Sequence, residues 1–129
     1  MARISRVLRS LADGKLAFWC PGCDGCHAVG VGEGQGPRWG YNGNVEAPTF
    51  TPSILVQGRD FTPKGRADFD AWGAAGRPEP VPEFENAPTV CHSFVTNGQI
   101  QFLGDCTHKL AGQTVPLPDW DAPYGGTEE

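Results

Sequence analysis

The sequence is poor in the features that identify several common classes of protein. No apolar run approaches the roughly 18 residues that a membrane-spanning helix needs, and the arginines at positions 3, 6 and 9 are not followed by the apolar segment of a secretory signal. Basic runs are lacking, and 15 acidic against 10 basic residues give a net charge of −5. Internal repeats are absent, which excludes solenoids and propellers. We therefore expect a protein outside the membrane, not secreted by a signal peptide, whose main partner is not nucleic acid.

Glycine and proline are abundant instead, with 18 and 12 copies among 129 residues. This composition favours turns and short strands over long helices. The length fits one domain with a modest core, and such a core gains stability from a metal cross-link. The prediction is a small, mainly β single domain over residues 1–129.

Cysteine usage points to a metal rather than to disulfides, because the five cysteines are an odd number and three of them lie close together. The stretch that holds these three reads Cys20-Pro21-Gly22-Cys23-Asp24-Gly25-Cys26-His27. A Cys-x-x-Cys loop lets two thiolates bind one ion, most often zinc. A tetrahedral site needs two more ligands, and the later chain offers Cys91, His92, Cys106 and His108. The sequence therefore predicts a zinc site in a reducing compartment.

The turn signal Asn97-Gly98 narrows this choice. If these two residues form the turn, Val95 faces Ile100 and Ser93 faces Phe102. Because side chains alternate along a strand, one face then carries Cys91, Ser93, Val95, Ile100, Phe102, Cys106 and, if the strand continues, His108. The other face carries His92, Phe94, Gln101 and Leu103. Cys91 and either Cys106 or His108 can thus reach one metal, whereas His92 points away and is free to hydrogen-bond.

The N-terminal segment is ambiguous, because residues 1–16 fit both a helix and a strand. The turn signal Asp13-Gly14 before a clear strand at residues 15–20 favours a strand through residues 4–8. Further on, the prolines at positions 48 and 52 exclude a central strand before Ser53, because proline cannot donate to a ladder.

Residues 58–88 are predicted to form a long loop excursion, because this segment is rich in proline and poor in apolar anchors. One or two helical turns are expected within residues 68–75, around Phe69 and Trp72. The last residues, 121–129, are predicted to be a frayed tail.

Whether the zinc is structural or catalytic depends on the groups around it. A structural site uses four protein ligands, whereas a catalytic site keeps a position for water near a general base. His27 and His92 are the spare histidines, and Asp24 and Asp105 are the nearby carboxylates. Zinc bound by two or three thiolates is a poor Lewis acid toward water, which favours a structural site.

A wider pattern of residues supports a family resemblance. It reads Cys20-Pro21-Gly22-Cys23 with His27, Trp39 and Asn42-Gly43, Pro48-Thr49-Phe50-x-Pro52-Ser53-Ile54, Cys91-His92-Ser93-Phe94 with Asn97-Gly98, and Asp105-x-x-His108-x-Leu110-Ala111-Gly112-Gln113. Over residues 16–117, without the excursion, it resembles a family of small, mostly phage- and prophage-encoded zinc-binding proteins of unknown function, sometimes labelled ammonia monooxygenase.

The resemblance implies zinc and phage origin. The predicted fold consists of short strands and hairpins joined by one zinc ion, of zinc-ribbon or β-tent-like type. In the family's pattern positions 26 and 106 need not be cysteine, which favours Cys20, Cys23, Cys91 and His108 as the four zinc ligands. Cys106 and His27 remain alternatives for one of the four. The enzyme label does not fit, because the chain has no membrane segment and no histidine-rich copper site.

Two functions of different classes follow from this reading. The favoured one is a phage accessory or virion-associated zinc-binding protein that acts through protein–protein interaction. We expect it in the host cytoplasm or the virion, and we favour a binding protein over an enzyme. The alternative is a zinc-dependent hydrolase in which metal-bound water attacks and His27 or His92 serves as acid/base. A weaker alternative is a modulator of host nucleic-acid machinery. The partner and the oligomeric state are not determined by the sequence.

Overall fold

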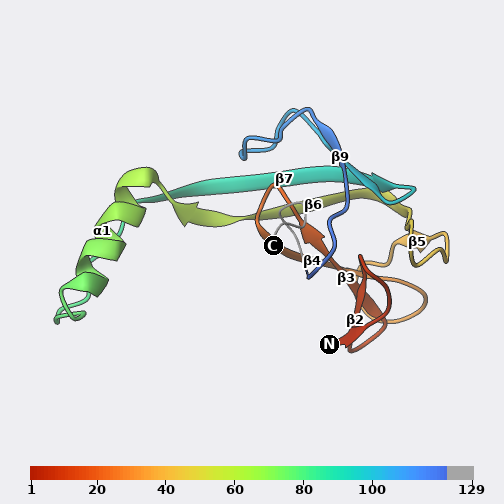
Figure 1. Cartoon of the computed structure of the whole chain (residues 1–129), viewed down its shortest axis with the longest axis horizontal. Helices are drawn as coiled ribbons and strands as arrows, with labels where there is room; N and C mark the ends of the chain where they lie inside the picture. Colours follow the sequence, from red (N-terminus) through yellow and green to blue (C-terminus); the bar gives the residue numbers. More distant parts are fainter. Residues whose placement is uncertain (122–129) are drawn as a thin grey trace. The chain divides into compact units, whose positions relative to one another are not determined.

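The computed structural model describes residues 1–121 and consists mainly of two antiparallel sheets (Figure 1). The first sheet has the order β1-β2-β3-β4 and contains β1 (Ala2–Arg3), β2 (Arg9–Leu11), β3 (Lys15–Cys20) and β4 (Gly25–Gly30). The second has the order β5-β6-β7-β8-β9 and contains β5 (Gly40–Tyr41), β6 (Phe50–Phe61), β7 (Asn86–Thr96), β8 (Gln99–Phe102) and β9 (Thr114–Pro116). One helix, α1 (Pro63–Ala74), completes the described part of the chain, and it is too short to cross a membrane. The predicted mainly β fold class is confirmed.

The chain divides into two compact units. Among the described residues, the main unit comprises Met1–Val56 and residues 90–121, and the excursion unit comprises Gln57–Thr89. The predicted frayed tail lies outside the described residues, apart from Asp121.

The core of the main unit is made by side chains from both sheets. Its buried residues include Leu16, Phe18 and Val29 from the first sheet and Phe50, Ile54, Val95, Ile100 and Phe102 from the second. Phe18 and Phe50 stack with ring centroids 6.2 Å apart. Cys20 and Cys91 belong to the same buried cluster, so two of the thiols predicted to bind metal lie within the hydrophobic core.

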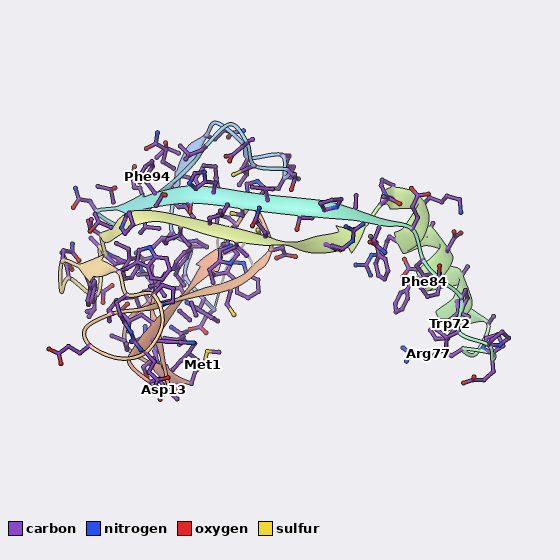
Figure 2. The ribbon with its side chains drawn as sticks, turned by 180° about the vertical axis from the view of Figure 1, so that it is seen from behind. Met1, Asp13, Trp72, Arg77, Phe84 and Phe94 are labelled. Atoms are coloured by element: carbon purple, nitrogen blue, oxygen red, sulfur yellow. The ribbon has the colours of Figure 1, made fainter. Side chains whose placement is uncertain are left out.

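The hairpin β7–β8 has the predicted register. Ser93 pairs with Phe102 and Val95 pairs with Ile100, and positive φ angles at Asn97 and Gly98 form the two-residue turn. Phe94 lies on the opposite, exposed face of β7 (Figure 2). The alternation of faces that the sequence analysis used is therefore correct along this hairpin.

Two local predictions are wrong. Residues 4–8 form a turn between β1 and β2 instead of a strand, because the Ser5 hydroxyl accepts hydrogen bonds from the N–H groups of Val7 and Leu8 at 3.2 and 3.1 Å. The strand β6 begins at Phe50, before Pro52, because Phe50 and Thr51 pair with β5 through groups that do not involve the proline nitrogen.

The excursion unit is more ordered than the predicted loop. Its helix begins at Pro63, several residues earlier than expected, because Thr62 caps the N-terminus by accepting the Gly65 N–H at 3.1 Å. Four aromatic side chains, Phe61, Phe69, Trp72 and Phe84, contact one another with ring centroids 5.2 to 6.0 Å apart. Arg77 lies over Trp72 beside this cluster (Figure 2).

Candidate active site and metal centre

A serine, a histidine and an aspartate form one hydrogen-bonded chain on the outer face of the second sheet. His92 Nε2 lies 3.0 Å from Ser53 Oγ, and His92 Nδ1 lies 3.2 Å from Asp105 Oδ2. The side chain of His92 is 28% exposed and that of Asp105 is 55% exposed, so a substrate can reach the group.

Each member of this triad is positioned by a different element. Ser53 lies in β6 and His92 in the neighbouring strand β7. Asp105 lies in the turn that follows β8. The Leu103 N–H donates to the His92 carbonyl oxygen at 2.9 Å, which holds the start of that turn against β7.

The polarity of the triad suits nucleophilic catalysis. When the imidazole hydrogen is on Nδ1, the ring donates to Asp105, and Nε2 is left to accept the hydrogen of the Ser53 hydroxyl. A hydroxyl that donates to a neutral imidazole, itself oriented by a carboxylate, is activated for attack on a carbonyl carbon.

A second cluster of reactive groups lies on the other face of β7. The donor atoms of Cys20, Cys23, His27 and Cys91 all lie within 4.8 Å of one another. Cys20 and Cys91 Sγ are 3.9 Å apart, which is too long for a disulfide. It is close to the roughly 3.8 Å that separates two thiolates bound at about 2.3 Å to one tetrahedral zinc ion. This group could therefore hold a metal ion.

The Cys20–Cys23 loop has the local geometry of a metal-binding turn. The Cys23 N–H donates to Cys20 Sγ at 3.3 Å, and the Asp24 N–H donates to the Cys20 carbonyl oxygen at 2.9 Å. Cys20 ends β3, and Gly25 opposite it begins β4. The loop is thus a tight connection between two paired strands, which fixes where both thiols lie.

The thiols share their protons unequally. The pKa of Cys20 is held far below its usual range, chiefly by hydrogen bonding from the Cys23 thiol and then from Cys91. In return, hydrogen bonding to Cys20 is the main reason that the pKa of Cys23 rises to about 11 and that of Cys91 rises well above its usual value. One thiolate in this group therefore keeps its neighbours protonated, and a cation is what would let all three ionise together.

Two histidines compete for the fourth position. His27 is in the group of three thiols, and its buried Nε2 has no hydrogen-bond partner within residues 1–121. His108, the ligand favoured from the sequence, forms a second group with Cys91 and Cys106, and its buried Nε2 likewise has no hydrogen-bond partner among the described residues. Its ring lies against Gly22, where a Cβ atom would be only 2.3 Å from the ring. Cys91 belongs to both groups of potential metal ligands.

The sequence analysis found most of these residues but assembled them differently. It assigned His92 to the free outer face of β7, as observed, and named Asp105 as a carboxylate near the site. It did not identify Ser53 as a functional residue. Ser53 contacts His92 only because β6 pairs with β7, and the excursion separates these two strands in the sequence. Cys26 is exposed and belongs to neither metal-binding group among the described residues.

A hydroxyl, an imidazole and a carboxylate in this order are the constellation of serine hydrolases. Comparison with known families agrees with this class. The chain belongs to the family described as bacterial ubiquitination-like system serine protease (BubE), whose family model matches residues 3–103. This range includes Ser53 and His92 and ends shortly before Asp105. The family is described as bacterial, so it does not support the phage family suggested by resemblance. No curated protein and no solved structure matches the chain.

Proposed function

We propose that this protein is a serine protease in which Ser53 is the nucleophile, His92 the general base and acid, and Asp105 the group that orients His92. The observation that carries the proposal is the hydrogen-bonded chain from Ser53 through His92 to Asp105, with heavy-atom distances of 3.0 and 3.2 Å. Membership of the family described as a serine protease supports the same conclusion.

The reaction follows from these contacts. The Ser53 hydroxyl attacks the substrate carbonyl carbon as its proton moves to His92 Nε2. The carboxylate of Asp105 stabilises the resulting imidazolium through the Nδ1–H group. The tetrahedral intermediate then expels the amine, which takes the proton from Nε2, and leaves an ester on Ser53. Water attacks this ester with His92 again as base, which releases the acid and restores the hydroxyl.

The edge of β6 offers a place for an extended substrate. β5 pairs with β6 only at Phe50 and Thr51, so within residues 1–121 no strand continues along this edge beside Ser53. The Trp39 indole N–H donates to the Ser53 carbonyl oxygen at 3.2 Å, and the Asn42 N–H on the β5 side donates to Thr49 at 3.2 Å. Because the N–H and C=O of one residue point to the same side of a strand, the Ser53 N–H is directed to this edge, beside the Trp39 indole.

We propose that a polypeptide segment binds in extended form along this edge, in line with β5. The Ser53 N–H is then a candidate donor to the oxyanion that forms on the substrate. The family description directs this proposal to protein substrates of a ubiquitination-like system. Two exposed apolar side chains flank the triad on the same face, because Leu55 follows Ser53 and Phe94 follows His92 at the two-residue period of a strand. They would contact apolar substrate side chains.

The metal in this proposal is zinc, and its role is structural. Three thiols and an imidazole are typical of structural zinc sites, and such a charge-rich ligand set makes zinc a poor activator of water. The alternative of a zinc-dependent hydrolase retains His92 as the acid/base but gives the nucleophile to metal-bound water instead of Ser53. We favour Ser53 because His92 contacts its hydroxyl directly, on the face of β7 away from the thiol of Cys91.

A fluorophosphonate probe tests the nucleophile, because it phosphonylates an activated serine and displaces fluoride. The parent protein should be labelled at Ser53, and both Ser53→Ala and His92→Ala should lose labelling. Ser10→Ala is the control, because this serine lies in β2 and its hydroxyl donates to the Ala2 carbonyl oxygen, not to a histidine. Labelling of Ser53→Ala at the parent rate would show that the activity resides elsewhere.

A further inference from the structure

The triad and the thiols occupy adjacent positions of the same two segments. Cys91 immediately precedes His92 in β7, and Cys106 immediately follows Asp105. Because neighbouring side chains of a strand point to opposite faces, the imidazole of His92 lies outside while the Cys91 thiol is buried. The two sites are therefore connected through single peptide units.

Cys106 makes a direct connection between them. The His92 N–H donates to Cys106 Sγ at 3.2 Å, and the Cys106 thiol lies 3.3 Å from the His92 carbonyl oxygen, to which it can donate. The same carbonyl oxygen accepts the Leu103 N–H. Cys106, the residue after Asp105, thus contacts the backbone of His92, and the side chain of Asp105 contacts the imidazole of the same histidine.

The neighbouring residues repeat this connection. The Thr107 N–H donates to the Val90 carbonyl oxygen at 2.9 Å, and the Val90 N–H donates to Thr107 Oγ1 at 3.0 Å. The segments 90–92 and 105–107 are therefore held side by side by several hydrogen bonds. Cys91 in the first segment and Cys106 and His108 in or beside the second also form a potential metal-binding group.

We propose that a metal ion bound by the thiols sets the geometry of the triad, although it takes no part in breaking the peptide bond. The ion would be a thiolate-binding metal such as Zn²⁺, held by Cys20, Cys23 and Cys91 with a histidine. The ion fixes the position of Cys91 and thereby that of the adjacent His92. The hydrogen bonds between Cys106 and the His92 backbone then hold the segment that carries Asp105 in place against β7. Cys106 is in these terms a positioning residue. This inference rests on the proposed function, since it concerns the same triad.

The chemical consequence is a serine protease that depends on a metal without using the metal as a Lewis acid. Loss of the ion would let the three cysteine side chains separate. Cys91 would then no longer be held at a fixed position, and the adjacent His92 would lose the constraint on its backbone. A displacement of about 1 Å in a catalytic group can cost about 100-fold in rate. The expected effect is therefore on the reactivity of Ser53, and the affinity for substrate should change little.

The experiment compares the zinc-loaded full chain with the same protein after removal of zinc by a chelator. Bound metal is measured by elemental analysis, folding by far-UV circular dichroism, and Ser53 reactivity by the rate of fluorophosphonate labelling. Removal should lower the labelling rate about 100-fold, and addition of Zn²⁺ alone should restore it. A metal-free protein that remains folded and is labelled at the parent rate would overturn the proposal.

Two variants keep the test decisive if the metal-free chain unfolds. Cys106→Ser leaves Cys20, Cys23, His27 and Cys91 in place, so zinc should stay bound while labelling slows. With a peptide substrate, kcat should fall and KM should not change. The downfield proton signal of the His92–Asp105 hydrogen bond should weaken in the NMR spectrum. Cys26→Ser is the matched control, because Cys26 is exposed and outside both groups, and it should behave as the parent in all four measurements.

The outcomes separate this inference from the proposed function. If Ser53→Ala loses labelling but neither zinc removal nor Cys106→Ser changes the rate of the parent, the protease assignment stands and the positioning role is wrong. If Ser53→Ala keeps full labelling, the triad itself is wrong, and the positioning role falls with it.

Discussion

Ser53 Oγ and His92 Nε2 lie 3.0 Å apart although 39 positions separate the two residues in the chain. The contact exists because β6 and β7 are neighbours in the second sheet and both residues project from its outer face. The proposed catalysis depends on this contact and on the contact between His92 Nδ1 and the Asp105 carboxylate.

The carboxylate gives the first prediction. Asp105→Asn keeps the size of the side chain, but its amide can donate to the imidazole and so favours the wrong tautomer of His92. The rate of cleavage should fall by about 10³- to 10⁴-fold, as is typical when a triad loses its orienting acid. The measurement is kcat/KM on a peptide substrate, with Asp70→Asn in α1 as a control of equal charge change. Equal rates for the two variants would remove Asp105 from the mechanism.

The second prediction concerns the apolar side chains beside the triad. Leu55 is 52% exposed and Phe94 is 40% exposed, so neither is needed to fill the core. Leu55→Asp and Phe94→Asp should leave the melting temperature nearly unchanged, as most exposed substitutions do. Both should raise KM for peptides with apolar residues next to the cleaved bond. Val81→Asp in the excursion unit is the control, since Val81 is exposed but distant in sequence from the triad. An unchanged KM in both variants would move the substrate away from this face.

The identity of the fourth metal ligand gives the third prediction. The resemblance-based set contains His108, whereas the three thiols lie with His27. The buried Nε2 atoms of both histidines have no hydrogen-bond partner in the described residues, but only His27 is grouped with all three thiols. We therefore expect His27→Ala to lose most of its zinc. In His108, Nδ1 accepts the Leu110 N–H at 3.2 Å, so this ring already has a local role. The test is the zinc content of the two purified variants, with Cys26→Ala as the control. Zinc loss in His108→Ala alone would restore the ligand set that the resemblance favours.

The sequence predicted the contacts between residues that are close along the chain, and it missed most contacts between residues that are far apart along it. The hairpin turn at Asn97-Gly98 and the Cys20–Cys23 loop are local, so residue types and spacing were enough to place Val95 opposite Ile100 and two thiols in one loop. The gathering of these thiols with Cys91 could also be anticipated, because soft ligands attract one metal. These steps gave the fold class and the candidate metal residues.

Ser53 could not be found in the same way. Its contact with His92 depends on the register of two strands that are separated by the excursion, and a shift of one residue would have turned Ser53 to the other face. A serine after proline has no local signal of catalysis. The helix α1 was placed too late for a related reason, because its beginning is set by the Thr62 cap and by Pro63, which read in isolation as loop residues.

Metal removal should also affect stability, which is the fourth prediction. The ion would join β3 to β7 across a separation of 71 positions. The binding free energy of a structural zinc site, about 10 kcal/mol, adds to the stability of the fold. Chelation should therefore lower the melting temperature of the main unit and broaden its transition. Calorimetry of the zinc-loaded and metal-free protein measures this, and a cooperative transition at the same temperature after verified zinc removal would contradict a structural role.

The last prediction uses two glycines of α1 that have opposite surroundings. At Gly65 a Cβ atom would be 1.8 Å from the Glu85 carbonyl oxygen, whereas at Gly73 nothing lies within 4 Å. Gly65→Ala should therefore push the helix away from residue 85 and destabilise the excursion unit, because a backbone atom cannot yield as a flexible side chain does. Gly73→Ala is the matched control and should stabilise the helix by up to about 1 kcal/mol, since alanine loses less conformational entropy there. Hydrogen exchange of the α1 amides distinguishes the two. Faster exchange is expected in Gly65→Ala and slower exchange in Gly73→Ala, and equal protection in both variants would mean that the close approach of Gly65 to Glu85 does not hold this helix in place.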